Sequence, residues 1–153
     1  IDIQQLSKDN VSNTIGYLEQ DTKLFSGTLR DNLSFGLVNV TDEQILKVAK
    51  LTGLISLISA LPKGLDTEVP EGGESVSVGQ RQLIALTRML IGNSKVLLLD
   101  EPTASMDEGT ERHLLATLQQ NLTKEQTLVV VTHKPALLSL VDRIVIMTEK
   151  GII

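Results

Sequence analysis

The stretch KVLLLDEPTASMD, residues 95–107, gives the clearest structural signal in this sequence. Its four aliphatic residues, 96–99, form a run typical of a strand that is buried on both faces. Two adjacent carboxylates, Asp100 and Glu101, end the run, and Pro102 then stops the strand. Ligands of an open parallel sheet bind outside the carboxyl ends of its strands, so this pair is placed to meet a ligand.

Composition excludes several functional classes before any motif is considered. The net charge is −5 with both signs mixed along the chain, so no basic surface is expected for nucleic acid or anionic lipid. One tyrosine, two phenylalanines and no tryptophan offer little for stacking on bases. There is no cysteine, which excludes disulfides and thiolate metal sites. The longest apolar run, residues 54–61, is far shorter than the ~18 residues that a membrane span needs.

Strands and helices are expected to alternate along most of the chain. Strands are predicted over residues 14–20, 95–100, 127–132 and 143–149, and helices over residues 41–53, 54–64, 77–92, 108–122 and 136–141. Capping boxes are expected at Thr41 with Gln44 and at Ser77 with Gln80, and Gly92 is expected at the C′ position of its helix. This order predicts an α/β fold, with a mostly parallel sheet and helices on both faces.

Residues 27–74 break the alternation and read as all-helical. We interpret them, together with the helix that follows, as an inserted helical subdomain over residues 27–92. Residues 1–26 and 93–153 then form the remainder of the core.

Polar residues end three of the predicted strands: Gln20, Asp100 with Glu101, and Thr132 with His133. They converge if the strands are parallel neighbours. One carboxylate, Asp100, is suited to hold Mg²⁺, while Glu101 orients or deprotonates an attacking water. A histidine beside them is suited to bond a terminal phosphate. These residue types therefore point to phosphoryl transfer.

The N-terminus of the helix at Ser77 is a second candidate site. A hydroxyl cap and Gly79 in the first turn leave backbone N–H groups open to an anion. Simpler readings stay open for every candidate: Asp100 and Glu101 as the start of a loop, His133 as a capping residue, and Ser77 as an ordinary N-cap.

Four stretches together resemble the ATPase domain of ATP-binding-cassette (ABC) transporters, over the length of the chain. EQDTKLFSGTLRDNLSFG (19–36) looks like the Q-loop, and LPKGLDTEVPEGGESVSVGQRQLIALTRML (61–90) looks like the exporter x-loop and the family signature. KVLLLDEPTASMD is similar to the Walker B strand and D-loop, and VVVTHK (129–134) to the switch with its histidine. The resemblance implies a P-loop NTPase-like fold with a RecA-like core.

The resemblance also implies roles, with ATP and Mg²⁺ as cofactors. Asp100 would orient Mg²⁺ through water, Glu101 would be the general base, and His133 would contact the γ-phosphate. Gln20 would sense Mg²⁺ and the attacking water and link the site to the membrane subunit. The signature Ser77-Val78-Gly79-Gln80 would bind ATP held by a second ATPase domain in a head-to-tail dimer, with Asp107 bridging the interface.

The sequence departs from the family pattern at the signature, at Pro70 in the x-loop, where exporters commonly have glycine, and at the P-loop. Val78 replaces the usual first signature glycine. The sequence also contains no Gly-Lys dipeptide, so the phosphate-binding P-loop motif is missing, and with it the strands that precede the Q-loop. Because IDIQQL (1–6) resembles the segment that follows the P-loop helix, we expect the natural protein to extend upstream. The isolated chain is expected to be inactive.

The x-loop, the segment 24–33 and the D-loop most resemble exporters, among them the bacterial type I secretion ATPases that export toxins and other proteins. This implies a transmembrane domain and secretion-complex components as partners, no nucleic acid, and a place at the cytoplasmic face of the bacterial inner membrane. A lipid or drug exporter is one alternative. A DNA-repair or chromosome-organising ATPase is another, although no heptads appear, and a nucleotide-free interaction module is a third.

Overall fold

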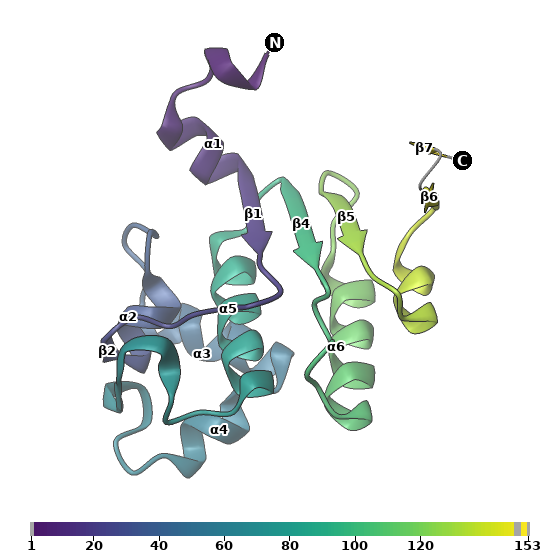
Figure 1. The fold of residues 1–153 in the computed structure, drawn as a ribbon. Coiled ribbons are helices and arrows are strands. Elements are labelled where there is room, and N and C mark those ends of the chain that lie inside the picture. Colours follow the sequence, from purple (N-terminus) through teal and green to yellow (C-terminus); the bar gives the residue numbers. More distant parts are fainter. Residues whose placement is uncertain (1, 149–150, 153) are drawn as a thin grey trace.

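The computed structural model describes residues 2–148 and 151–152. Its centre is a three-stranded parallel sheet in the order β1 (Ile15–Leu18), β4 (Val96–Asp100) and β5 (Thr127–Val131), as Figure 1 shows. Leu99 of the middle strand pairs with Leu18 on one side and with Val130 on the other. The predicted α/β class with a parallel sheet is confirmed, and the stretch 95–107 supplies its central strand.

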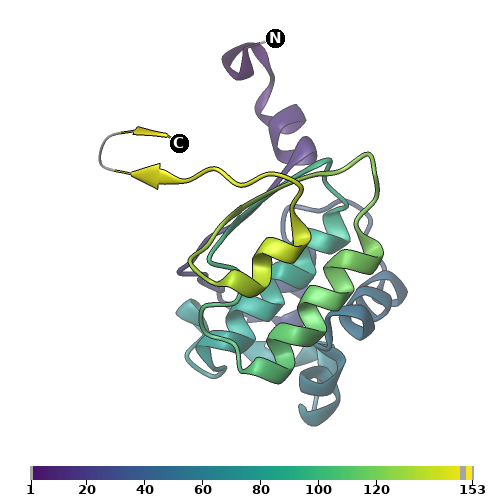
Figure 2. The same ribbon diagram turned by 90° about the vertical axis from the view of Figure 1, so that its right-hand side faces the viewer.

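Two long helices, α5 (Val78–Gly92) and α6 (Glu108–Asn121), lie against one face of this sheet (Figure 2). Leu18, Leu97 and Leu99 point into that layer and are at most 1% exposed. On the opposite face Val129 and Val131 are 47% and 61% exposed. Helices were expected on both faces, but the described residues cover only one.

Helix α5 is the central element of the molecule because it is buried on two sides. Toward the sheet it contributes Leu86 and Met89 to one apolar cluster, and away from the sheet it contributes Leu83 and Ile84 to another. The second cluster is completed by α2 (Leu29–Ser34), α3 (Asp42–Thr52) and α4 (Ile55–Ala60).

The capping boxes expected at Thr41 and Ser77 are both present. The left-handed residue at the end of α5 is Asn93, with φ 49°, one position after Gly92, which was expected to take that conformation. Asparagine tolerates that conformation better than most residues. Gly92 stays helical, where a Cβ atom would lie 3.1 Å from Leu37 Cδ2.

The region expected to be all-helical also contains strand pairing. Strand β2 (Gly27–Thr28) runs antiparallel to β3 (Glu68–Val69) and thereby joins the two ends of the region. The remaining short helices are α1 (Lys8–Thr14) and the 3₁₀ helices η1 (Ile3–Gln5), η2 (Gly64–Asp66) and η3 (Glu71–Gly73).

The last predicted elements differ most from the structure. The helix expected at 136–141 is a 3₁₀ helix, η4 (Pro135–Leu140). The strand predicted over 143–149 does not join the sheet: residues 143–146 are exposed coil, and β6 (Met147–Thr148) pairs antiparallel with β7 (Gly151–Ile152). Residue 149 lies outside the described residues. Residues 143–146 pair with no strand in the described part of the chain, and the outer edge of β5 stays unpaired.

Candidate functional site

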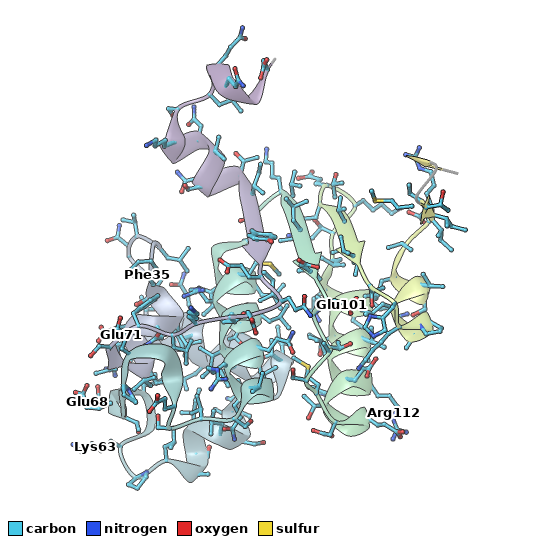
Figure 3. The ribbon with its side chains drawn as sticks, in the orientation of Figure 1. Phe35, Lys63, Glu68, Glu71, Glu101 and Arg112 are labelled. Carbon is cyan, nitrogen blue, oxygen red and sulfur yellow. The ribbon has the colours of Figure 1, made fainter. Side chains whose placement is uncertain are left out.

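The carboxyl ends of β4 and β5 meet at Glu101. This residue follows β4 directly, and its backbone N–H donates to the Val131 carbonyl of β5 at 2.9 Å. Its φ of 45° is in the left-handed region, which turns the chain sharply out of the strand. The side chain lies near the end of β4 in Figure 3 and is only 13% exposed, while the neighbouring Asp100 is half-buried.

The Glu101 carboxylate is held by the two residues that follow β5. His133 donates its backbone N–H to Oε1 at 3.1 Å and places its ring Nδ1 2.7 Å from the same oxygen. The Thr132 hydroxyl lies 3.4 Å from Oε2. The imidazole itself is 79% exposed, so one edge of the ring faces the carboxylate and the rest faces outward. The structure therefore brings Glu101 and His133 into direct contact.

Gln20 stands at the same edge of the sheet but does not join this cluster. It follows β1, which is the parallel neighbour of β4, and it is exposed. No hydrogen bond joins its side chain to Glu101 or His133 in the described part of the chain. Beside it, a cleft of about 480 Å³ is lined by Asp21, Thr22, Lys23, Leu24, Phe25, Glu71, Gly72 and Arg81.

The residues expected to bind a phosphate at α5 form a self-capped helix end. Gln80 N–H donates to Ser77 Oγ at 3.1 Å, and Ser77 N–H donates to Gln80 Oε1 at 2.8 Å. Val78 between them is 48% exposed. Gly79 has a separate requirement, because a Cβ atom at this position would lie 2.6 Å from the Ser105 carbonyl oxygen. The first turn of α5 therefore packs against the turn over residues 101–107.

Asp107 caps the next helix, α6. Its carboxylate accepts from Gly109 N–H at 2.9 Å, from Thr110 N–H at 3.0 Å and from the Thr110 hydroxyl at 2.6 Å. The hydrogen bonds from Thr110, first from its hydroxyl and then from its backbone, hold the pKa of Asp107 below its usual value. In this structure the Asp107 carboxylate is therefore engaged in capping α6 of its own chain.

Two residues that sequence reasoning did not select hold the turn over residues 101–107. Gln82, 2% exposed, donates from Nε2 to the Glu101 carbonyl at 2.7 Å. Lys134 donates from Nζ to the Thr103 carbonyl at 2.8 Å and pairs with Glu111 at 2.7 Å. One sequence feature could have marked Gln82 as buried: it is a polar residue at the start of the apolar stripe that Leu86 and Met89 continue. No sequence feature marked Lys134.

The carboxylates at this edge suit a cation that is bound partly by the protein and partly by phosphate oxygens. In the described residues no three His, Cys, Asp or Glu side chains gather where they could enclose a metal ion. Mg²⁺ is commonly held by one or two carboxylates and completed by waters and substrate phosphates. Asp100 and Glu101 match that pattern, and they do not match a fully enclosed metal site.

Comparison with known proteins agrees with this geometry. Residues 1–104 match the family model described as ABC transporter. The chain belongs to the ABC transporter family. It is 37% identical over 152 residues to YwjA, an ABC transporter ATP-binding protein of Bacillus subtilis (strain 168), with 99% of this chain and 26% of YwjA covered. It is 36% identical over 147 residues to PrsD, a type I secretion system ATP-binding protein of Rhizobium meliloti (strain 1021), with 96% and 25% covered.

The fold is also that of a solved ABC protein. The structure of a bacterial Atm1-family ABC exporter with ATP bound superposes with a TM-score of 0.83 at 30% identity, covering 90% of this chain and 24% of that one. The chain thus spans about a quarter of the length of these ABC proteins. Within its described part, no helix has the length and apolar character needed to cross a membrane.

Proposed function

We propose that this chain is part of the ATP-hydrolysing domain of an ABC exporter. The observation that supports this best is the Glu101 carboxylate, largely buried at the sheet edge beside Asp100 and fixed by His133 and Thr132. A carboxylate held in one orientation is what a general base for an attacking water requires. Phosphoryl transfer depends mainly on positioning and charge stabilisation, which this edge is built to supply.

Each residue of the edge has a proposed part in that reaction. Asp100 would hold Mg²⁺, which when bound neutralises charge on the phosphates. Glu101 would accept the proton of the attacking water. His133 would bond the γ-phosphate, and Gln20 would contact the Mg²⁺ and the water.

The imidazole of His133 must change its hydrogen bonding before it can donate to the γ-phosphate. A hydrogen bond from its Nδ1–H to the Glu101 carboxylate leaves Nε2 of a neutral ring as an acceptor, which does not bond a phosphate oxygen. The ring must therefore either carry a second proton or leave Glu101. Leaving Glu101 frees the base at the moment when ATP is present, so we expect His133 to exchange the carboxylate for the phosphate.

The signature residues Ser77, Val78, Gly79 and Gln80 would serve ATP bound to a second ATPase domain in a head-to-tail dimer. The Ser77 hydroxyl accepts from Gln80 N–H, so its own hydrogen remains available to a phosphate oxygen. Asp107 would lie at the same interface, although its carboxylate already caps α6. The turn over residues 101–107 would then contact the partner mainly through its backbone.

The remaining assignments concern the longer protein. We propose residues 27–92 as the helical subdomain and residues 1–26 and 93–153 as the core. A transmembrane domain would contact the Gln20 side of the molecule, where the cleft lies, from the cytoplasmic face of the membrane. Protein or toxin export with secretion-complex components is proposed from the resemblance to type I secretion ATPases. A lipid or drug exporter is the alternative, and export assays with candidate cargoes distinguish the two.

The decisive experiment replaces the two carboxylates separately in a full-length ABC protein that contains this chain. Glu101→Gln should leave ATP affinity intact and lower turnover by about 10²-fold or more, the scale expected when a general base is lost. Asp100→Asn should instead raise the Mg²⁺ concentration needed for half-maximal turnover. Normal turnover by Glu101→Gln would show that another residue is the base.

The dimer is tested by complementation. Ser77→Arg should block closure over the partner's ATP while the variant still binds nucleotide itself, whereas Ser75→Arg, at an exposed position in the same loop, should have little effect. Mixing Ser77→Arg with Glu101→Gln should restore part of the turnover. In the heterodimer, one site combines the intact Glu101 of the Ser77→Arg subunit with the intact Ser77 of the Glu101→Gln subunit. Verified heterodimers without recovery would contradict a role for Ser77 in trans.

A further inference from the structure

The backbone of Glu101 is held in a conformation that it would not adopt unaided. A non-glycine residue in the left-handed region carries a cost that surrounding contacts must offset. On its N–H side, Glu101 is fixed by the Val131 carbonyl of β5. On its carbonyl side, Glu101 accepts from Ala104 N–H at 3.1 Å within its own turn. A second hydrogen bond to the same carbonyl comes from α5 and ties the turn to that helix.

That contact is made by Gln82. Its side-chain Nε2 donates to the Glu101 carbonyl at 2.7 Å, and its Oε1 lies 3.4 Å from Ser105 N–H on the far side of the same turn. One carboxamide thus spans the turn over residues 101–107. At 2% exposure it is shielded from water, so neither hydrogen bond is readily replaced by solvent.

The same helix touches the turn at a second point. Gly79 lies so close to the Ser105 carbonyl that a Cβ atom would clash with it at 2.6 Å. Ser77, Gly79 and Gln82 lie within the first two turns of α5, so the helix end and the turn form one packed unit. A shift of the α5 N-terminus would therefore move the backbone of Glu101.

We propose that Gln82 is a positioning residue, which fixes the backbone of Glu101 and so aims its carboxylate, and which couples that carboxylate to the N-terminus of α5. The inference rests on the proposed function, because it assumes that Glu101 acts in hydrolysis. Gln82 was not among the predicted site residues at Glu101 or at Ser77. Its buried amide would be the mechanical link between these two groups.

The test uses the same full-length protein with Gln82→Met, which keeps the length of the side chain and removes both hydrogen bonds. Turnover at saturating ATP should fall about tenfold or more, since small displacements of a catalytic group have effects of that size or larger, while nucleotide affinity stays within about twofold. Gln120→Met, at an exposed glutamine of α6, is the matched control and should change neither.

A double-mutant cycle separates positioning from general damage. If Gln82 acts through Glu101, adding Gln82→Met to Glu101→Gln should leave the residual turnover unchanged within about twofold. A further drop equal to that of the single variant would overturn the proposal. If Glu101→Gln itself turned over normally, the proposed base would be wrong. Normal turnover by Gln82→Met alone would contradict the positioning role of Gln82 and leave the proposed role of Glu101 unaffected.

Folding is controlled with a second substitution and with thermal unfolding of each variant. Gln82→Leu is uncharged, has a similar volume and also removes the hydrogen bond to the Glu101 carbonyl. It should lose turnover as Gln82→Met does while the protein still unfolds cooperatively. Full turnover in Gln82→Leu contradicts the proposal. Loss of folding in both variants would assign Gln82 to stability and would also overturn it.

Discussion

The two faces of the parallel sheet differ sharply. Toward α5 and α6, Leu97 and Leu99 of β4 are at most 1% exposed. On the other face, Tyr17 of β1 and Val129 and Val131 of β5 are 58%, 47% and 61% exposed, although they belong to the same sheet. One face is completed by the chain's own helices, whereas the described chain leaves the other uncovered.

This difference bears directly on the site. Along β4, residues 97 and 99 point into the covered layer, so Asp100 points toward the uncovered face. The sequence holds no P-loop motif that could place a phosphate there. The described chain thus supplies the edge that we propose to be catalytic, and we propose that a phosphate-binding group lies against the uncovered face.

The largest effect is expected from truncating the covered face. Leu99→Ala should lower the free energy of unfolding by about 2–5 kcal/mol, because it opens a cavity in a dry apolar cluster. Val129→Ala, on the uncovered face, should change it by less than about 0.5 kcal/mol. Denaturant unfolding of both variants measures the contrast. Equal losses would mean that the two faces are buried alike in solution.

A smaller but visible effect is expected on self-association. Val129 on the uncovered face and Val145 in the coil before β6 are both exposed, and the outer edge of β5 has no strand partner within the described residues. We expect the isolated chain to associate, and the double substitution Val129→Lys with Val145→Lys to reduce the mass found by light scattering. Val38→Lys, at an exposed valine away from the sheet, is the control. A wild-type chain that stays monomeric at working concentrations would contradict this expectation.

The smallest effect concerns the cap of α6, one of the two covering helices. Because the folded-state pKa of Asp107 is lowered, its stabilising contribution is present above the unfolded pKa of about 3.9 and is lost as pH falls through the folded value. Asp107→Asn keeps a capping side chain but should flatten the acid side of the stability profile. Thermal unfolding between about pH 2 and pH 7 would detect this. An unchanged acid slope would show that Asp107 does not contribute.

Local sequence rules predicted the elements whose partners lie nearby. The capping boxes at Thr41 and Ser77, the aliphatic run of β4 and the meeting of Glu101 with His133 followed from spacing and from the geometry of parallel strands. The family resemblance rested on the same short motifs.

The remainder depended on contacts that spacing does not encode. Residues 143–149 have a strand-like composition, but composition does not say which strand they would pair with, and within the described residues 143–146 pair with none. Gln82 resembles any polar residue on a long helix until packing brings its amide to the Glu101 carbonyl. The side chain of His133 was expected at a phosphate, yet in the structure its ring contacts the Glu101 carboxylate.

The most direct test measures Mg²⁺-dependent ATP hydrolysis by the isolated chain and by a full-length ABC protein that contains it, each with its Glu101→Gln counterpart. The isolated chain should be indistinguishable from its own Glu101→Gln control, because its sequence contains no P-loop motif to bind the phosphates. In the full-length protein the same substitution should lower turnover by about 10²-fold or more. Turnover by the isolated chain above its control, or full turnover by the full-length variant, would contradict the proposed role of Glu101 as the base.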